Sequence, residues 1–190
     1  MVTPADALRR LVEVLDRLAI PHMIGGSVAS SIHGMARPTM DVDLVAALQP
    51  SQVDRFAAEL RSDFYADPEM IRAALERGRP FNLIHYASTF KFDIFPVLPD
   101  AYHLTQFARR VMAEATQFGD VAIRCAVATA EDTILAKLEW YRAGGETSER
   151  QWNDLRGILR VRGPALDLEY LRRWAPELGV TDLLERLLAE

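Results

Sequence analysis

The sequence predicts an α+β fold, in which a small mixed or antiparallel sheet is flanked by helices and followed by a helical C-terminal portion. Two observations support this prediction. Short apolar or alternating runs typical of strands occur only before about residue 128, with helical periodicity between them. Beyond that point, every periodic segment has helical spacing. We therefore expect residues 1–128 to form an α+β core and residues 129–190 to form helices that pack on it and share its core.

The first elements are marked by clear boundary signals. A helix begins at Thr3 and Pro4, where a capping residue precedes a proline, and leucines at helical spacing continue it. A short strand at 20–24 runs directly into the turn Gly25-Gly26-Ser27, and a helix over 28–33 follows. This order of strand, glycine turn and helix is the first feature that could take part in ligand binding or catalysis.

The rest of the front portion alternates strands with helices, and the back portion is helical. We expect strands at 42–45, 81–86, 90–97, 111–118 and 121–127, and helices at 50–60, 67–78, 129–143, 148–161, 167–174 and 181–189. The strands at 81–86 and 90–97 should pair antiparallel. The last two strands should form a hairpin through Gly119-Asp120, although the alanine-rich first arm also fits a helix.

Composition excludes several classes of protein. The chain has 190 residues, 49% hydrophobic and 26% charged, with no apolar run near the ~18 residues of a membrane span and no start resembling a signal peptide. We expect a cytoplasmic protein without a membrane partner. The net charge of -5 argues against a non-specific nucleic-acid coat protein. The single cysteine, Cys125, excludes an internal disulfide and a cysteine-based zinc cluster.

Two aspartates separated by one residue form the second chemical feature. Asp41 and Asp43 lie on one face of their strand, about 6 to 7 Å apart, which suits hard divalent cations such as Mg2+. Asp93 is the best candidate for a third carboxylate, because it is the only acid in the apolar strand 90–97. Three carboxylates repel one another unless cations neutralise them. We therefore expect two Mg2+ ions, with Mn2+ as the alternative.

The glycine turn would supply the complementary site for phosphate. The glycines let backbone N–H groups approach phosphate oxygens, and the start of the following helix adds positive potential. Gly25, Gly26 and Ser27 are thus candidates for binding the phosphates of a nucleotide. Arg37, which lies just before Asp41, either positions the loop or contacts phosphate. Such parts suit in-line phosphoryl or nucleotidyl transfer.

The two lysines stand out because the other basic residues are all arginines. Lys137 either contacts phosphate or lies on the surface beside the apolar stripe of its helix. Lys91 shares a strand face with Asp93 and either pairs with it or is solvated. Asp154 has the i−4 spacing for an ion pair with Arg150. The three tryptophans are expected to pack in the core or between helices rather than to stack on bases.

Taken together, the motifs resemble a known family. Gly25-Gly26-Ser27, then the run 37–43 and then Asp93 resemble the nucleotidyltransferase superfamily that includes DNA polymerase β and the small bacterial nucleotidyltransferases. Residues 129–159, with Lys137 and Asp154, resemble the abortive-infection type toxin nucleotidyltransferases. The resemblance covers roughly residues 20–160.

This resemblance implies a role for each site residue. Asp41, Asp43 and Asp93 would bind metal, and Asp93 would also help to activate the acceptor hydroxyl. Gly26 and Ser27 would hold the triphosphate, and Lys137 would contact its phosphates. The toxin label implies RNA or a protein as the acceptor, and an antitoxin as a partner.

We therefore expect an enzyme that moves a nucleoside monophosphate from a nucleoside triphosphate such as ATP to an acceptor hydroxyl on RNA or protein. One alternative is an adenylyltransferase that acts on a small antibiotic. Another is a non-catalytic nucleotide-binding or antitoxin module. The complete set of three aspartates argues against the last alternative, because binding alone does not require all three.

Overall fold

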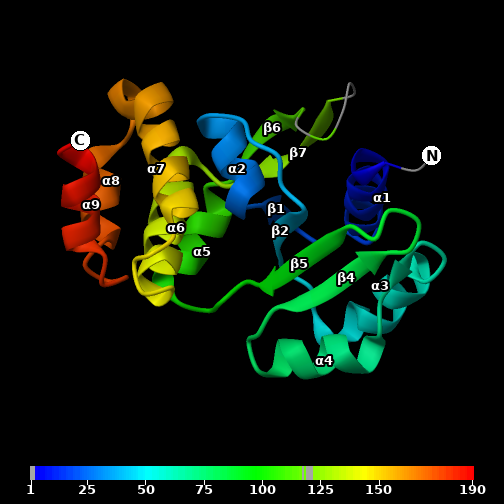
Figure 1. Ribbon diagram of the computed structural model, residues 1–190. Coiled ribbons are helices and arrows are strands. Elements are labelled where there is room, and N and C mark those ends of the chain that lie inside the picture. Colours follow the sequence, from blue (N-terminus) through cyan, green and yellow to red (C-terminus); the bar gives the residue numbers. More distant parts are fainter. Residues whose placement is uncertain (1–2, 117, 119–121) are drawn as a thin grey trace.

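The computed structural model describes residues 3–116, 118 and 122–190. Figure 1 shows their arrangement. In chain order the elements are α1 (Pro4–Arg17), β1 (His22–Ile24), α2 (Gly26–His33), β2 (Asp41–Ala46), η1 (Pro50–Gln52), α3 (Val53–Leu60), β3 (Phe64–Tyr65), α4 (Pro68–Glu76), β4 (Phe81–His85), β5 (Lys91–Pro96), α5 (Ala101–Ala108), β6 (Val111–Ala115), β7 (Ile123–Val127), α6 (Ala130–Ala143), α7 (Glu149–Arg162), η2 (Gly163–Ala165), α8 (Leu168–Trp174) and α9 (Thr181–Leu188).

The strands of the described residues form one seven-stranded sheet in the order β3-β4-β5-β2-β1-β7-β6. Strand β2 pairs antiparallel with β1 and parallel with β5, and β1 also pairs parallel with β7. The other neighbours are antiparallel, including the expected pair β4 and β5. The predicted mixed α+β fold is therefore confirmed.

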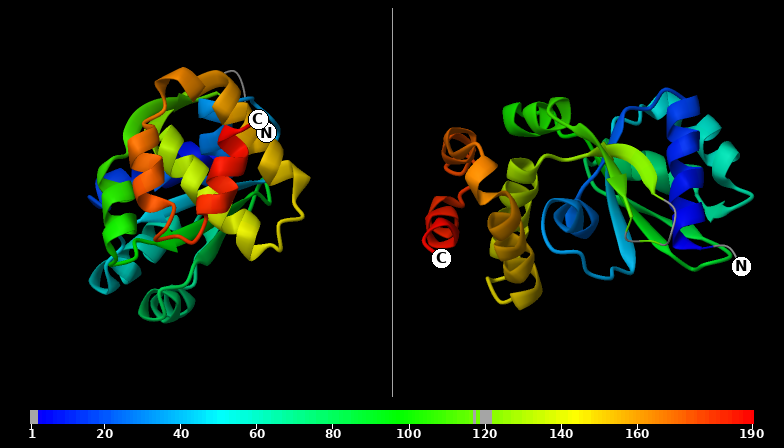
Figure 2. Two further views of the ribbon diagram at one scale, coloured as in Figure 1. Left: turned by 90° about the vertical axis from the view of Figure 1, so that its left-hand side faces the viewer. Right: turned by 90° about the horizontal axis from the view of Figure 1, so that it is seen from above.

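Helices cover the two faces of the sheet differently. Figure 2 (right) shows α1 and α3 on one side of the sheet, and α2 with the C-terminal helices on the other. Apolar side chains of α1 and α3, such as Leu8 and Phe56, pack with Val42, Leu44 and Phe92 from the central strands. One face of β2 and β5 is thus committed to the core, which leaves the alternate residues on the opposite face.

The buried apolar side chains of the described residues form two clusters, and not the single shared core that we expected. The second cluster lies among the C-terminal helices and includes Leu138, Trp152 and Leu171. Tyr102 of α5 belongs to it although it precedes residue 128. The proposed division at residue 128 stays a prediction.

Helix α2 joins the two parts of the molecule. Val28 and Ala29 belong to the first apolar cluster. At the other end of the helix, a Cβ on Gly34 would lie 2.7 Å from the backbone nitrogen of Ile158 in α7. Because that distance is too short for a real side chain, a glycine is needed where α2 crosses α7.

Most local predictions match the structure. The caps at Thr3 and Thr129 are present, and both arms of the predicted hairpin are strands, whereas its turn at Gly119-Asp120 lies outside the described residues. Helix α5 and the short strand β3 were not predicted. Among the described residues, no helix is long and apolar enough to cross a membrane.

The tryptophans do not all pack as expected. Trp152 and Trp174 are buried, with 4% and 3% of their surface exposed. Trp140 is 57% exposed, so its expected packing between helices is wrong.

Candidate functional site

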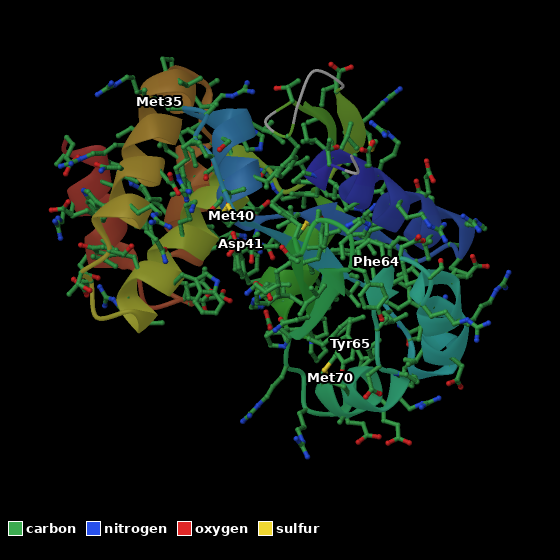
Figure 3. All side chains as sticks on the ribbon, turned by 45° about the vertical axis from the view of Figure 1, so that its right-hand side comes forward. Met35, Met40, Asp41, Phe64, Tyr65 and Met70 are labelled. Carbon is green, nitrogen blue, oxygen red and sulfur yellow. The ribbon has the colours of Figure 1, made fainter. Side chains whose placement is uncertain are left out.

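The register between β2 and β5 brings the predicted carboxylates together. The two strands pair in parallel, so that Asp43 lies beside Asp93 and Asp41 lies beside Lys91. All four side chains share the partly exposed face, because Phe92 and its alternate neighbours point into the core. In Figure 3, Asp41 lies between the C-terminal helices and the strands.

The surroundings of Asp43 disfavour the charged form of its carboxyl group. Burial raises its pKa to about 6, and the negative charges of Asp41 and Asp93 act in the same direction. The positive charges of Lys137 and Lys91 oppose this rise only in part. A carboxylate that is destabilised by like charges is one that a bound cation would stabilise.

Lys91 pairs with the third carboxylate. Its Nζ lies 2.8 Å from Oδ2 of Asp93, and 43% of the lysine side chain is exposed. This bond is the main reason why the pKa of Lys91 is raised, and the charges of Asp41 and Asp43 add to it. Of the two roles considered for Lys91, the structure supports pairing with Asp93.

The donor set fits a divalent cation in chemistry, although its side chains have other partners in this conformation. Asp41, Asp43 and Asp93 offer hard oxygen ligands on one face, as Mg2+ prefers. Yet Asp93 is paired with Lys91, and Oδ1 of Asp41 accepts a hydrogen bond from Thr39. Within the described ranges, no three His, Cys, Asp or Glu side chains are already gathered as a metal site. Metal binding would therefore require these partners to be exchanged.

The glycine turn lies directly against Asp43. The N–H of Gly25 donates to the backbone carbonyl of Asp43 at 2.9 Å. Gly26 has φ +51, and a Cβ there would lie 1.7 Å from Oδ2 of Asp43. Backbone conformation and lack of space both require glycine at this position. The predicted phosphate turn and the predicted metal ligands thus meet at one place.

A partly buried ionic cluster lies beside the turn. The Nε and Nη2 groups of Arg37 donate to the two carboxylate oxygens of Asp154 at 2.7 and 2.8 Å. Lys137 Nζ donates to Oδ2 of Asp154 at 2.8 Å, and both residues are buried. Nη2 of Arg37 also donates to Oγ of Ser27 at 2.7 Å. The cluster therefore links the glycine turn to α6 and α7.

The ion pair expected between Asp154 and Arg150 was wrong. Over the residues that the structure describes, Asp154 pairs with Arg37 and Lys137 and not with Arg150, which is exposed. Of the two roles considered for Lys137, the surface alternative is the one excluded, because only 6% of the residue is exposed. The signal in the sequence was the position of Lys137 beside the apolar stripe of its helix, because a lysine buried there requires an anion nearby.

The cluster carries more positive than negative charge. Burial by itself would raise the pKa of Asp154, but the bonds from Arg37 and Lys137 outweigh it and lower the pKa. Asp154 is therefore a carboxylate shared by two cations. The excess positive charge lies beside Ser27, where a phosphate group would be attracted.

We expect Asp154→Ala to lower the free energy of unfolding by about 3 kcal/mol, because it leaves two cations without their shared buried anion. Urea denaturation measures this loss. Arg150→Ala is the matched control on the same helix and should change stability by less than about 0.5 kcal/mol. Equal losses in the two variants would contradict the assigned pairing.

Gly26→Ala should lower stability by about 1–2 kcal/mol through its positive φ and should also displace the Asp43 carboxylate. Gly145→Ala is the control, because Gly145 has φ +72 but nothing within 4 Å of its Cβ position. Both variants should melt earlier. Only Gly26→Ala should lose Mg2+ binding, measured by calorimetry, and retention of that binding would refute the contact.

The raised pKa of Asp43 predicts a pH-dependent gain in stability for Asp43→Asn. The folded protein holds this proton more tightly than the unfolded chain, so ionised Asp43 lowers stability above pH 6 and not below about pH 4. In metal-free buffer the variant should be more stable by about 3 kcal/mol at pH 7.5, with the gain disappearing toward pH 4.

Asp63→Asn provides a control of opposite sign. The bond from Arg10 lowers the pKa of Asp63, so this variant should lose stability at pH 7.5. Thermal unfolding from pH 4 to 8 measures both effects. The same sign in the two variants would contradict the raised pKa of Asp43.

Comparison with known proteins finds similarity in structure but not in sequence. No protein-family model and no curated protein matches the chain. The structure of an antigenic nucleotidyltransferase-like protein from Paracoccidioides brasiliensis matches with a TM-score of 0.56 and 18% identity, over 99% of this chain and 94% of that one.

Two solved structures of similar length also match. ANT(2")-Ia in complex with adenylyl-2"-tobramycin has a TM-score of 0.52 and 15% identity, covering 91% of this chain and 95% of that one. The lincomycin-bound lincosamide antibiotic adenylyltransferase LnuA has a TM-score of 0.50 and 11% identity, covering 84% and 98%. At such low identity the matches concern the fold, and none of the three is described as an abortive-infection toxin. The chain therefore has a nucleotidyltransferase-like α+β fold.

Proposed function

We propose that the protein transfers a nucleoside monophosphate from a nucleoside triphosphate to an acceptor hydroxyl, with release of pyrophosphate. One observation carries this proposal. Asp43 and Asp93 lie in register on neighbouring strands, with Asp41 on the same face, and Gly26 of the glycine turn lies against Asp43. Carboxylates next to a backbone turn that can approach phosphate suit nucleotidyl transfer better than binding alone.

Each part of the site has a role in this reaction. Asp41, Asp43 and Asp93 would hold two Mg2+ ions, or Mn2+, whose charge would offset the negative charge on the phosphate. Asp93, once released from Lys91, would accept the proton of the acceptor hydroxyl. That hydroxyl oxygen would form its bond to the α-phosphorus as the bond to pyrophosphate breaks.

The positively charged cluster would hold the triphosphate. Arg37 and Lys137 are fixed by Asp154, and Arg37 contacts Ser27 in the glycine turn. Because their positions are set before the ligand arrives, little side-chain entropy would be lost on binding. The turn residues Gly25 and Gly26 would contribute close backbone approach.

A small hydroxylated molecule is the acceptor that we favour. Support comes from ANT(2")-Ia and LnuA, which are solved with an adenylyl-tobramycin and with lincomycin, and whose lengths this chain matches closely. The net charge of -5 also favours a neutral or cationic acceptor over RNA.

RNA or a protein is the second candidate acceptor, within a toxin that has an antitoxin partner. It rests on the resemblance of residues 129–159 to the abortive-infection type toxin nucleotidyltransferases. Two residues of that region, Lys137 and Asp154, are bonded to each other.

The test is transfer of radioactive label from each α-labelled nucleoside triphosphate in the presence of Mg2+. Parallel reactions contain a panel of aminoglycosides and lincosamides, total RNA, or cell-extract protein. Label on a small molecule supports the first acceptor, and label on a macromolecule supports the second. Nucleotide binding without label on any acceptor would favour the non-catalytic alternative.

Asp93→Asn should reduce the single-turnover rate by about 100-fold or more, because an amide is a poor base and a weaker ligand for a hard cation. Nucleotide affinity should change little, since Asp41, Asp43 and the ionic cluster remain. Glu114→Gln, on the exposed edge strand β6, is the control and should retain full activity. A parallel fall in rate and affinity would make Asp93 only a part of the nucleotide site.

A further inference from the structure

The exposed tryptophan has a neighbour that gives it a defined orientation. Trp140 packs edge-on against Phe95, with ring centroids 6.2 Å apart and an angle of 72° between the rings. A single exposed apolar side chain is ordinary on a protein surface. The position of Trp140 relative to the charged groups is what gives it significance.

Each aromatic residue is a near neighbour of a charged residue of the candidate site on the same strand or helix. Phe95 follows Asp93 by two residues on the same face of β5, a distance of about 6 to 7 Å along the strand. Trp140 follows Lys137 by three residues, so both project from neighbouring positions on one side of α6. In Figure 1, the chain that leaves β5 runs toward the lower end of α6. The aromatic pair therefore borders the charged groups.

We propose that Trp140, supported by Phe95, is the surface on which the nucleobase of the bound nucleoside triphosphate stacks. This inference rests on the proposed function. In a nucleoside triphosphate, one sugar separates the flat base from the phosphates. In the site, the exposed indole of Trp140 lies three residues from Lys137 on the same helix. Phe95 packs against the indole and limits its freedom, while 57% of Trp140 remains exposed to a ligand.

The chemistry of stacking sets the expected selectivity. Every base has a π face, so stacking on an aromatic side chain tolerates all four bases. Loss of one such contact weakens binding by about 10-fold. Trp140 should therefore contribute affinity for all four nucleotides and should contribute nothing to binding of inorganic tripolyphosphate, which has no base.

The test compares these two ligands, with Mg2+ present, by calorimetry and by intrinsic fluorescence. Stacking of the base of a nucleoside triphosphate should quench the fluorescence of Trp140. The other two tryptophans should not contribute to this change, because they are buried. Trp140→Ala should weaken nucleotide binding about 10-fold and leave tripolyphosphate binding unchanged. Trp140→Phe should lose less. Met112→Ala, a control that removes a 58% exposed side chain from the distant edge strand β6, should change neither.

The outcomes separate this inference from the proposed function. Unchanged nucleotide affinity in Trp140→Ala would overturn the stacking role and leave nucleotidyl transfer intact. A higher KM for the acceptor without a change in nucleotide affinity would assign the indole to the acceptor, and would also overturn it. If the wild-type protein binds neither nucleotides nor tripolyphosphate, the proposed function fails as well.

Discussion

The parallel pairing of β2 with β5 is the constraint on which the candidate site depends. It sets Asp43 beside Asp93, with Asp41 on the same face. Slipping the register by one residue would turn Val42 or Phe92 out of the core, which the hydrophobic effect strongly disfavours. Packing on one face of the sheet therefore enforces charge repulsion on the other.

The groups around the carboxylates respond to this repulsion. Lys91 pairs with Asp93, and Gly26 provides space for the carboxyl group of Asp43, which has no room beside a larger residue. Burial, together with the repulsion that remains from Asp41 and Asp93, nevertheless raises the pKa of Asp43 to about 6. Strain of this kind persists where the rest of the fold fixes the geometry, and it is common at functional sites.

Local features could be predicted from the sequence, whereas features that depend on distant residues could not. The alternation in 90–97 gave the shared face of Lys91 and Asp93, because period-two geometry is a property of the strand alone. Asp154 was assigned to Arg150 by helical spacing, but its partner Arg37 is 117 residues away. An exposed pair at i−4 is worth a few tenths of a kcal/mol, so a buried tertiary contact readily displaces it. Helix α5 was missed because Tyr102 is the only apolar residue that it buries fully.

The two lysines differ in how easily their partners could be exchanged. The pair between Lys91 and Asp93 is partly exposed, and such pairs are worth about 0–1 kcal/mol, so an incoming cation could take Asp93 at low cost. The pair between Lys137 and Asp154 is buried on both sides, and removing either partner from such a pair costs about 3–5 kcal/mol. A ligand would therefore meet fixed positive charges beside the glycine turn and an exchangeable counter-ion at the carboxylates. The pair between Lys91 and Asp93 costs little free energy to separate, whereas the pair between Lys137 and Asp154 costs much more. Binding of metal and nucleotide should therefore begin with the release of Asp93 from Lys91.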